Sequence, residues 1–408
     1  MANSADEKKN ATGGSDGSSS NMPLSGVRIL EFGQYAAGPF GSMLLGDWGA
    51  EVVKIEPPGG EDLRRWPPQV SGPDGDYSLN FASISRNKRS ITADLKDEKD
   101  CARIRQLISK ADILLENFRP GVMDRLGFGY GDVIKINPRI VYTSVSGYGH
   151  FGPYYGKGAF DIAIQGASGI MSITGEEDGP PAKCGVPFGD FASGLFGALS
   201  CMVGLHSARR TGKGCRMDVP MLSCMLACSA LQTSEYWGTG NVPSRMGSAH
   251  PRNAPYQAFQ AGDGVYFIIA AGNDRLYSIL CDTINCAELK TDPRFISTKL
   301  RATNQKALQI LIEEALKAKS ADEWRELMDL AGIPTAPVLS YAEVLQDPQV
   351  IASGIIQPMS LPNGGETKTI GNPVRMSGYE FEIFQQPPLA GEHNDVVIEE
   401  WLDDRNGW

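Results

Sequence analysis

The sequence lacks any run of about 18 or more consecutive apolar residues, the length that a transmembrane helix needs, although hydrophobic residues make up 41% of its 408 residues. Basic residues are also in deficit. The 38 lysines and arginines stand against 48 aspartates and glutamates and give a net charge of -10. Proteins that bind nucleic acid through its phosphates need a basic surface. We therefore expect neither a membrane nor a nucleic acid as a partner.

Several motifs of ligand binding are missing as well. The eight cysteines form no CxxC pair and no cysteine–histidine spacing typical of a metal site. We interpret them as core thiols in a reducing cytoplasm, and we expect no metal. TGKG (211–214) lacks the remainder of a P-loop, and no GxGxxG follows the first predicted strand. Neither a P-loop nor a nicotinamide site is predicted.

The first residues of the chain differ in composition from the rest. Residues 1–22 are polar and low in complexity. They have neither the apolar core of a signal peptide nor the arginines of a transit peptide. We interpret them as a disordered tail. GGSDG (13–17) matches the nucleophile-elbow pattern in form only, because no strand–turn–helix pattern surrounds it.

Apolar strands alternate with helical stretches in the first half of the chain. VRILEF (27–32) and EVVKIE (51–56) flank an apolar helical segment, and the alternation continues through DEKDCARIRQLISKA (97–111) and RIVYTSVSGYG (139–149). The predicted strands are apolar on both faces, as strands covered by helices on both sides are. We predict an α/β fold with a Rossmann-like large domain around a parallel sheet.

A different pattern follows a long apolar helix predicted near 188–210. Residues 256–273 have the pattern of a hairpin, and three helical stretches come after it. This pattern predicts a smaller α+β domain. From about residue 345 we predict mainly loops that pack back on the large domain and end in a short helix. The predicted limits are 23–210 and 345–408 for the large domain, 225–330 for the small domain, and 211–224 and 331–344 for linkers.

Basic residues gather in one part of this acidic chain. Several of them follow predicted strands, where α/β sheets bind their ligands. The group favours a phosphate-bearing ligand, although any single member of it would be expected on a solvated surface. The residues are Arg64, Arg65, Lys88, Arg89, Lys96, Arg119 and Arg125.

Asp161 opens the helical stretch IAIQGASGI. A carboxylate at this position can accept the free N–H groups of the first turn. Ile164 stands where a capping box would place Glu or Gln. A helix start also keeps a carboxylate ionised, as a carboxylate nucleophile must be. The local sequence favours the capping role and leaves the nucleophile role open.

Several blocks follow one another in order from about Leu24 to the end of the chain. They include GVRILEFGQYAAGPF, NKRSITADLK, ADILLENFRPGVMDRLGFGY, AFDIAIQGASGIMSITG, RRTGKGCRMDVPM and GIPTAPVLSYAEVLQDPQV. In these blocks the chain resembles the family III CoA-transferases, which include formyl-CoA transferase and carnitine CoA-transferase, and the related 2-methylacyl-CoA racemases, which share the fold. The resemblance implies CoA transfer from an acyl-CoA to a small organic acid, without a prosthetic group. It also implies an interlocked, ring-shaped homodimer.

The resemblance assigns roles to individual residues. It implies that Asp161 attacks the donor thioester, forming first an aspartyl anhydride and then an aspartyl-CoA thioester. The CoA contacts that it implies are Lys96, Asn117, Phe118, Arg125 and Tyr148. We add a set of candidates for the acyl pocket, namely Ala36, His150, Glu235, His250, Gly272 and Asn273.

Two alternatives stay open. The first is a 2-methylacyl-CoA racemase, which needs two acid–base groups on opposite faces of the α-carbon. Phe160 stands where racemases carry histidine, and no histidine lies between 90 and 149, so transfer is favoured. The second is a CoA-binding subunit of a heteromeric transferase, against which the intact Asp161 argues.

Ala36 replaces a glutamine of formyl-CoA transferase and argues against formyl or oxalate specificity. The sequence does not identify the two acids.

Overall fold

The computed structural model describes residues 22–402. Their tertiary contacts divide them into two compact units, and each unit is described by itself. The first comprises residues 22–164, 187–228 and 355–402, and the second comprises 165–186 and 229–354. The predicted disordered tail lies outside the described residues except for Met22.

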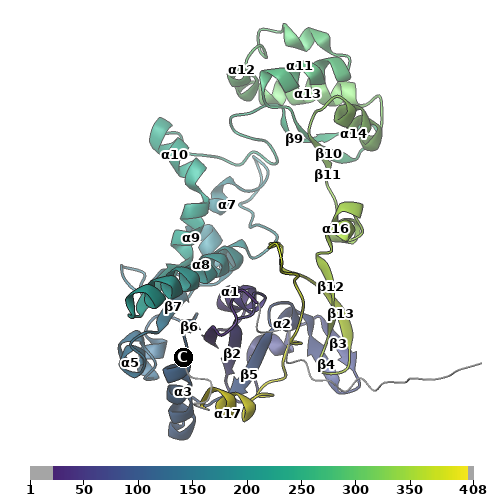
Figure 1. Cartoon of the computed structure of the whole chain (residues 1–408). Helices are drawn as coiled ribbons and strands as arrows, with labels where there is room; N and C mark the ends of the chain where they lie inside the picture. Colours follow the sequence, from purple (N-terminus) through teal and green to yellow (C-terminus); the bar gives the residue numbers. More distant parts are fainter. Residues whose placement is uncertain (1–21, 403–408) are drawn as a thin grey trace, which may run out of the picture. The chain divides into compact units, whose positions relative to one another are not determined.

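A six-stranded parallel sheet forms the centre of the first unit (Figure 1). The strand order is β5-β2-β1-β6-β7-β8, and every pairing is parallel. The order changes direction between β1 and β6, so the switch point of the sheet lies there. The predicted α/β fold with a parallel sheet is confirmed. The strands are β1 (Arg28–Phe32), β2 (Glu51–Glu56), β5 (Lys88–Thr92), β6 (Ile113–Glu116), β7 (Val141–Ser146) and β8 (Cys215–Pro220).

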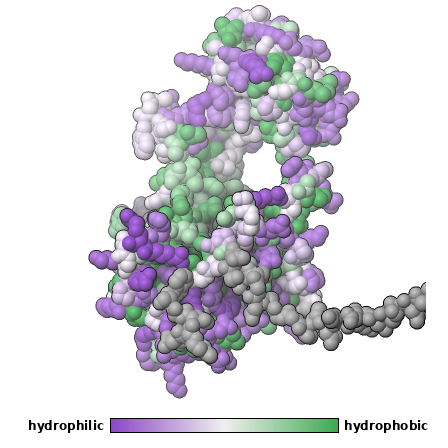
Figure 2. Space-filling view, viewed as in Figure 1, coloured by the Kyte–Doolittle hydropathy of each residue, from purple (hydrophilic) through white to green (hydrophobic). Residues whose placement is uncertain are grey.

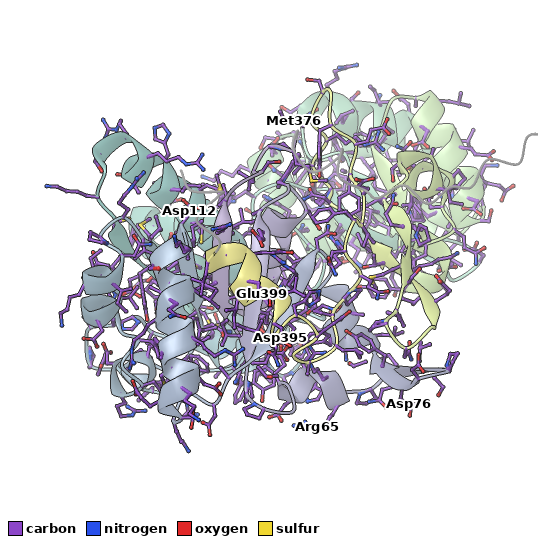
Figure 3. The ribbon with its side chains drawn as sticks, turned by 60° about the horizontal axis from the view of Figure 1, so that its bottom comes forward. Arg65, Asp76, Asp112, Met376, Asp395 and Glu399 are labelled. Atoms are coloured by element: carbon purple, nitrogen blue, oxygen red, sulfur yellow. The ribbon has the colours of Figure 1, made fainter. Side chains whose placement is uncertain are left out.

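Helices cover both faces of this sheet because alternate strand residues are apolar on each side. Leu30 and Phe32 of β1 pack in a core with α3 (Glu98–Lys110) and α17 (Val396–Leu402), and Figure 3 shows α17, which carries the labelled Glu399, beside α3. Ile29 points to the other face, which α1 and α8 cover. The remaining helices of this unit are α1 (Ala37–Gly46), η2 (Asp62–Arg65), α2 (Leu79–Ser83), α4 (Val122–Arg125), α5 (Tyr130–Ile136), α8 (Phe188–Thr211) and α9 (Met221–Cys228), and α6 (Asp161–Ala167) begins in it.

α8 is an apolar helix of 24 residues. Among residues 22–402, it is the one helix that passes a test of length and composition for crossing a membrane, a test that core helices pass too. One face of α8 packs on the sheet through Cys201 and Leu205. The other face exposes Leu195, Leu199 and Val203, and Figure 2 shows hydrophobic atoms gathered over this part of the unit.

Two glycines let α1 and α8 touch backbone to backbone. A Cβ atom at Gly41 would lie 2.6 Å from the carbonyl oxygen of Gly194, and one at Gly194 would lie 2.7 Å from the carbonyl oxygen of Ala37. Beside this contact, the rings of Phe40 and Phe191 lie 4.8 Å apart. The close approach brings the loop after β1 next to the first turn of α8.

The prediction of loops beyond residue 345 was wrong in part. This region forms α16 (Pro348–Ser353) and the hairpin of β12 (Ile356–Ser360) and β13 (Glu366–Ile370). Half-exposed strands such as IQPMS and ETKTI leave little apolar alternation to detect. From residue 355 the described tail groups with the first unit, and the His393 N–H donates to the Ser90 carbonyl at 2.9 Å. A further hairpin of β3 (Gln69–Gly72) and β4 (Gly75–Ser78) was also missed.

The second unit contains a three-stranded antiparallel sheet, as expected for a small α+β domain. Its strands are β9 (Tyr256–Gln260), β10 (Tyr266–Ala270) and β11 (Thr335–Pro337). Phe267, Leu280 and Trp324 are buried in its core. Its helices are α7 (Ile170–Ile173), α10 (Ala230–Thr239), α11 (Asp274–Thr283), η3 (Ala287–Lys290), α12 (Thr298–Thr303), α13 (Gln305–Leu316), α14 (Ala321–Leu330), α15 (Tyr341–Val344) and α16.

The two units begin and end at residues other than the predicted domain limits. Residues 211–224, predicted as a linker, contain β8 and lie in the first unit because β8 pairs with β7. Residues 331–344 contain β11, which pairs with β10 of the second unit. Residues 165–186 and 345–354 also group with the second unit rather than with the first. Hydrophobic patterns predict local structure, and they carry little information about which of the two units a segment packs in.

Candidate active site

A cleft of about 360 Å³ lies in the first unit at the carboxyl ends of three strands. Residues 34–37 follow β1, residues 117–120 follow β6, and residues 146–147 end and follow β7. In open α/β sheets, ligands bind in this position, at the switch point of the strand order. The cleft is therefore the candidate active site.

Three of the predicted site residues, Ala36, Asn117 and Phe118, meet in this cleft. The Asn117 side chain binds the loop after β1 through both of its polar groups. Its Oδ1 accepts the Gln34 N–H at 2.8 Å, and its Nδ2 donates to the Gln34 carbonyl at 2.8 Å. Asn117 therefore joins the loops after β1 and β6, a function that its predicted CoA contact did not include.

Asp190 also lines the cleft, from the first turn of α8, and it is not among the residues predicted for the site. Burial raises the pKa of its carboxyl to about 7, and the charge of Asp161 adds to the increase. Asp190 is the sole charged residue of α8 before Arg209. An acidic residue is common in the first turn of a helix, so this feature did not mark Asp190 as a site residue.

Asp161 lies next to Asp190. The Oδ1 atom of Asp161 accepts the Gly189 N–H at 2.8 Å and the Asp190 N–H at 3.4 Å. Asp161 thus binds the start of α8, whereas the predicted cap was of the helix that Asp161 itself begins, α6. Asp161 is not among the residues that line the cleft. The structure brings two carboxylates together, and Asp190 is the one in the cleft wall.

One of the two cations of the cleft, Arg119, belongs to the basic group found in the sequence, and the other, Lys157, does not. Arg119 and Lys157 line the cleft, while Lys96 and Arg125 are exposed and do not. Tyr148 is also absent from the lining, and its ring packs 5.3 Å from that of Tyr154. The CoA contacts of Lys96, Arg125 and Tyr148 stay predictions.

His150 lies in a separate, smaller cavity of about 10 Å³, room for about one water. Its Nε2 lies 2.7 Å from the Ser144 Oγ. Buried Glu116 lines the same cavity, and its Oε2 accepts the Phe118 N–H at 2.8 Å. Burial raises the pKa of Glu116 to about 7. A carboxyl that is about half protonated at pH 7 thus supports the backbone of the loop after β6.

Replacing Glu116 with glutamine is expected to remove part of the pH dependence of stability. The folded protein holds a proton on Glu116 that the unfolded chain loses between pH 4.5 and about 7, so this group's contribution falls as the pH rises through that window. The loss is about 3 kcal/mol at most. Urea unfolding at about pH 5 and about pH 8 measures it for both proteins. An equal pH dependence in the variant would contradict the assignment.

The four remaining candidates belong to the second unit. Glu235 lines a cavity of about 310 Å³ and forms an ion pair with Arg252. The His250 Nδ1 accepts the Arg252 N–H at 3.1 Å. Asn273 caps α11, and a side chain at Gly272 would meet Asn253 at 2.8 Å. These contacts give the four residues local structural roles, and their place in an acyl pocket stays a prediction.

Within residues 22–402, no group of three or more His, Cys, Asp or Glu side chains is arranged to hold a metal ion. The eight cysteines are free thiols, and half of them, Cys101, Cys201, Cys224 and Cys281, are buried. Cys228, expected in the core, is exposed.

Comparison with known families shows to which class of proteins the chain belongs. Residues 24–394 match the model of CoA-transferase family III. The chain belongs to CoA-transferase family III. It is an acyl-CoA:carboxylate CoA-transferase, as the resemblance implied, and CoA thioesters are its substrates.

Individual relatives agree over nearly the whole chain. The acetyl-CoA:oxalate CoA-transferase of Acetobacter aceti is 42% identical over 360 residues, which are 88% of this chain and 90% of the relative. The human succinyl-CoA:glutarate CoA-transferase is 36% identical over 94% of this chain and 87% of its own. The crystal structure of a CAIB/BAIF family protein from Brucella suis is 37% identical, has a TM-score of 0.83, and is matched over 93% of this chain and 100% of its own.

Proposed function

We propose that this transferase carries CoA from donor to acceptor through an aspartyl anhydride and an aspartyl-CoA thioester formed in the cleft. The sequence resemblance assigned the nucleophile to Asp161. The position of Asp190 in the cleft wall favours Asp190 instead, because Asp161 directs an oxygen to the N–H groups at the start of α8. We therefore propose Asp190 as the nucleophile and Asp161 as its neighbour that fixes the helix start.

The reaction then proceeds by exchange of acyl groups on one carboxylate. An Asp190 oxygen attacks the thioester carbonyl and the C–S bond breaks. The CoA thiolate departs, and an anhydride between Asp190 and the donor acid is formed. The thiolate attacks the aspartyl carbonyl and releases the donor acid. The acceptor carboxylate next attacks the aspartyl thioester, which releases the thiolate and forms an anhydride between Asp190 and the acceptor. The thiolate then attacks the acceptor's carbonyl in this anhydride, which gives the new acyl-CoA and frees the Asp190 carboxylate. Each bond broken is close in energy to the bond formed, which splits one difficult step into easier ones.

The pH profile of kcat/KM should follow the ionisation of Asp190, because the attacking carboxylate must be deprotonated. We expect activity to rise with pH through about 7 and then to level off. Asp161→Asn removes a neighbouring negative charge and keeps a carbonyl oxygen that can accept the Gly189 N–H. The midpoint of the profile should therefore move to lower pH. A midpoint that stays in place or rises would show that Asp161 does not act on Asp190 in this way.

We propose a short carboxylic acid as the acceptor. The relatives described above are named for oxalate and glutarate as acceptors and for acetyl-CoA and succinyl-CoA as donors. Two cations, Arg119 and Lys157, line the cleft and suit the phosphates of CoA or a second carboxylate of the acid. A matrix of acyl-CoA donors against mono- and dicarboxylic acids, read by mass spectrometry of the new thioester, identifies the pair. Epimerisation without transfer would support the racemase instead.

We also propose that two copies of the chain form the interlocked dimer that the resemblance implies. The exposed stripe of Leu195, Leu199 and Val203 on α8, with Leu226 on α9, supports a covered apolar face (Figure 2). Light scattering of the purified protein should give twice the chain mass of 44.0 kDa. A monomer would contradict the proposal, and a second chain in equal amount would indicate the heteromeric alternative.

A further inference from the structure

Tyr35 holds an unusual backbone conformation at the edge of the cleft. Its φ of 59° lies in the left-handed region, which costs a residue with a side chain free energy unless contacts hold it there. Tyr35 lines the cleft, and its ring lies 6.2 Å from that of Phe160 and 5.6 Å from that of Trp66. The rings of Tyr35 and Phe160 form an aromatic wall of the cleft, and Phe160 precedes Asp161 in the chain. The backbone conformation of Tyr35 therefore determines the position of this wall.

Glu61 provides the contact that holds this backbone. Its Oε2 accepts the Tyr35 N–H at 2.8 Å, and its Oε1 lies 2.7 Å from the Lys54 Nζ. The Lys54 Nζ also donates to the Gly33 carbonyl at 2.6 Å. Glu61 is 3% exposed and Lys54 is fully buried. Two backbone groups of the loop after β1 are thus bound by a charge pair that water does not reach.

Burial makes these contacts strong. Hydrogen bonds to ionised groups are roughly twice as strong as those between neutral groups, and a low local dielectric strengthens them further. Asn117 holds the adjacent peptide of Gln34 from the other side. Neither Glu61 nor Lys54 lines the cleft, so their effect on a ligand has to pass through the loop.

We propose that Glu61 is a positioning residue for CoA transfer, acting through the Tyr35 N–H to keep the aromatic wall of the cleft in place beside the reacting carboxylates. The proposal deepens the proposed function and rests on it. It assigns to Glu61 an effect on the position of the bound acyl group, and not on the affinity of the enzyme for CoA.

Two substitutions at position 61 separate positioning from packing. Glu61→Met keeps much of the volume but cannot accept the Tyr35 N–H. Glu61→Gln keeps an oxygen that can. In both variants the Lys54 Nζ keeps its ion pair with Glu31, at 2.8 Å, and its hydrogen bond to the Gly33 carbonyl. We expect Glu61→Met to lower kcat by about tenfold or more, the scale of effect that a small misplacement of reacting groups produces. Glu61→Gln should restore most of kcat, and the Kd for free CoA should change less than about twofold in both.

Asp47→Asn is the matched control. Asp47 is a buried carboxylate paired with Arg86 at 2.7 Å, and it does not line the cleft. This variant should lower Tm with little change in kcat. If Glu61→Met does not fold, Glu61→Ala tests the same contact, and the emission of the neighbouring Trp66 reports a displaced wall.

Wild-type kcat in folded Glu61→Met, or equal losses in the Met and Gln variants, would overturn the proposal. So would a kcat loss in Asp47→Asn as large as that in Glu61→Met. Mapping of the acylated peptide keeps this result distinct from the nucleophile assignment. An adduct on Asp190 of the wild-type protein, together with wild-type kcat in Glu61→Met, refutes only the positioning role. A loss of kcat in Glu61→Met, together with a wild-type protein that forms no adduct on Asp190, refutes only the nucleophile assignment.

Discussion

Asp190→Asn should abolish the covalent enzyme intermediate and lower kcat by about a thousandfold or more, the scale of loss when a nucleophile is removed. The amide cannot attack a thioester, while the shape of the side chain and the capping of α8 by Asp161 are retained. The measurement is incubation with an acyl-CoA, trapping with hydroxylamine or borohydride, and mass mapping of the modified peptide. Stability should not fall, since the charge repulsion between Asp161 and Asp190 disappears.

Asp161→Asn is the control for this experiment. It should keep the adduct on Asp190 and a measurable turnover with the altered pH profile described above. The opposite pattern, with label on Asp161 and activity retained in Asp190→Asn, would return the nucleophile to Asp161 as the sequence resemblance assigned it. Labelling of neither residue would refute the anhydride mechanism.

Lys54→Met should lower the free energy of unfolding by about 3–5 kcal/mol, the cost typical of removing one partner from a buried ion pair. The Lys54 Nζ lies 2.8 Å from the Glu31 Oε1 and 2.7 Å from the Glu61 Oε1. Without it, a fully buried Glu31 keeps only Lys88 and the Ser42 hydroxyl as close partners. Urea unfolding monitored by tryptophan fluorescence measures the change.

Lys290→Met provides the matched substitution at an exposed ion pair. Lys290 contacts Asp282 at 2.5 Å, but the aspartate side chain is 61% exposed. Exposed pairs contribute about 0–1 kcal/mol. A stability loss in Lys54→Met that is no larger than that in Lys290→Met would show that the buried network around Glu31 is not important for the fold.

The two ends of the chain illustrate which elements the sequence could predict. β1 and β2 are buried on both faces, and the predicted strands at 27–32 and 51–56 agree with them within one residue. The hairpin of β12 and β13 was missed because its exposed residues give no clear alternation. Strong patterns come from deep burial, so the core was predictable and the surface hairpins were not.

The candidate site shows the same limit more sharply. Asp161 was found because it opens a short helix and lies in a block that resembles a known family. Asp190 begins a long apolar helix, and nothing local separated it from an ordinary first-turn acid. The fold brings the two together, as the Asp161 Oδ1 bonds to the Gly189 N–H. Contacts between residues 28 positions apart depend on how the helices pack, which no local pattern records.

The sequence by itself determined the parallel α/β sheet, the small α+β domain and the membership of CoA-transferase family III. The reason is that the spacing of apolar residues and the order of motifs are properties of the linear chain. The tertiary structure alone decided which carboxylate lies in the cleft wall and that Asn117 and Glu61 hold the loop after β1. Those facts depend on distances between separate strands and helices. Such distances follow from packing, above all from the backbone contact of Gly41 with Gly194 that places α8 against α1.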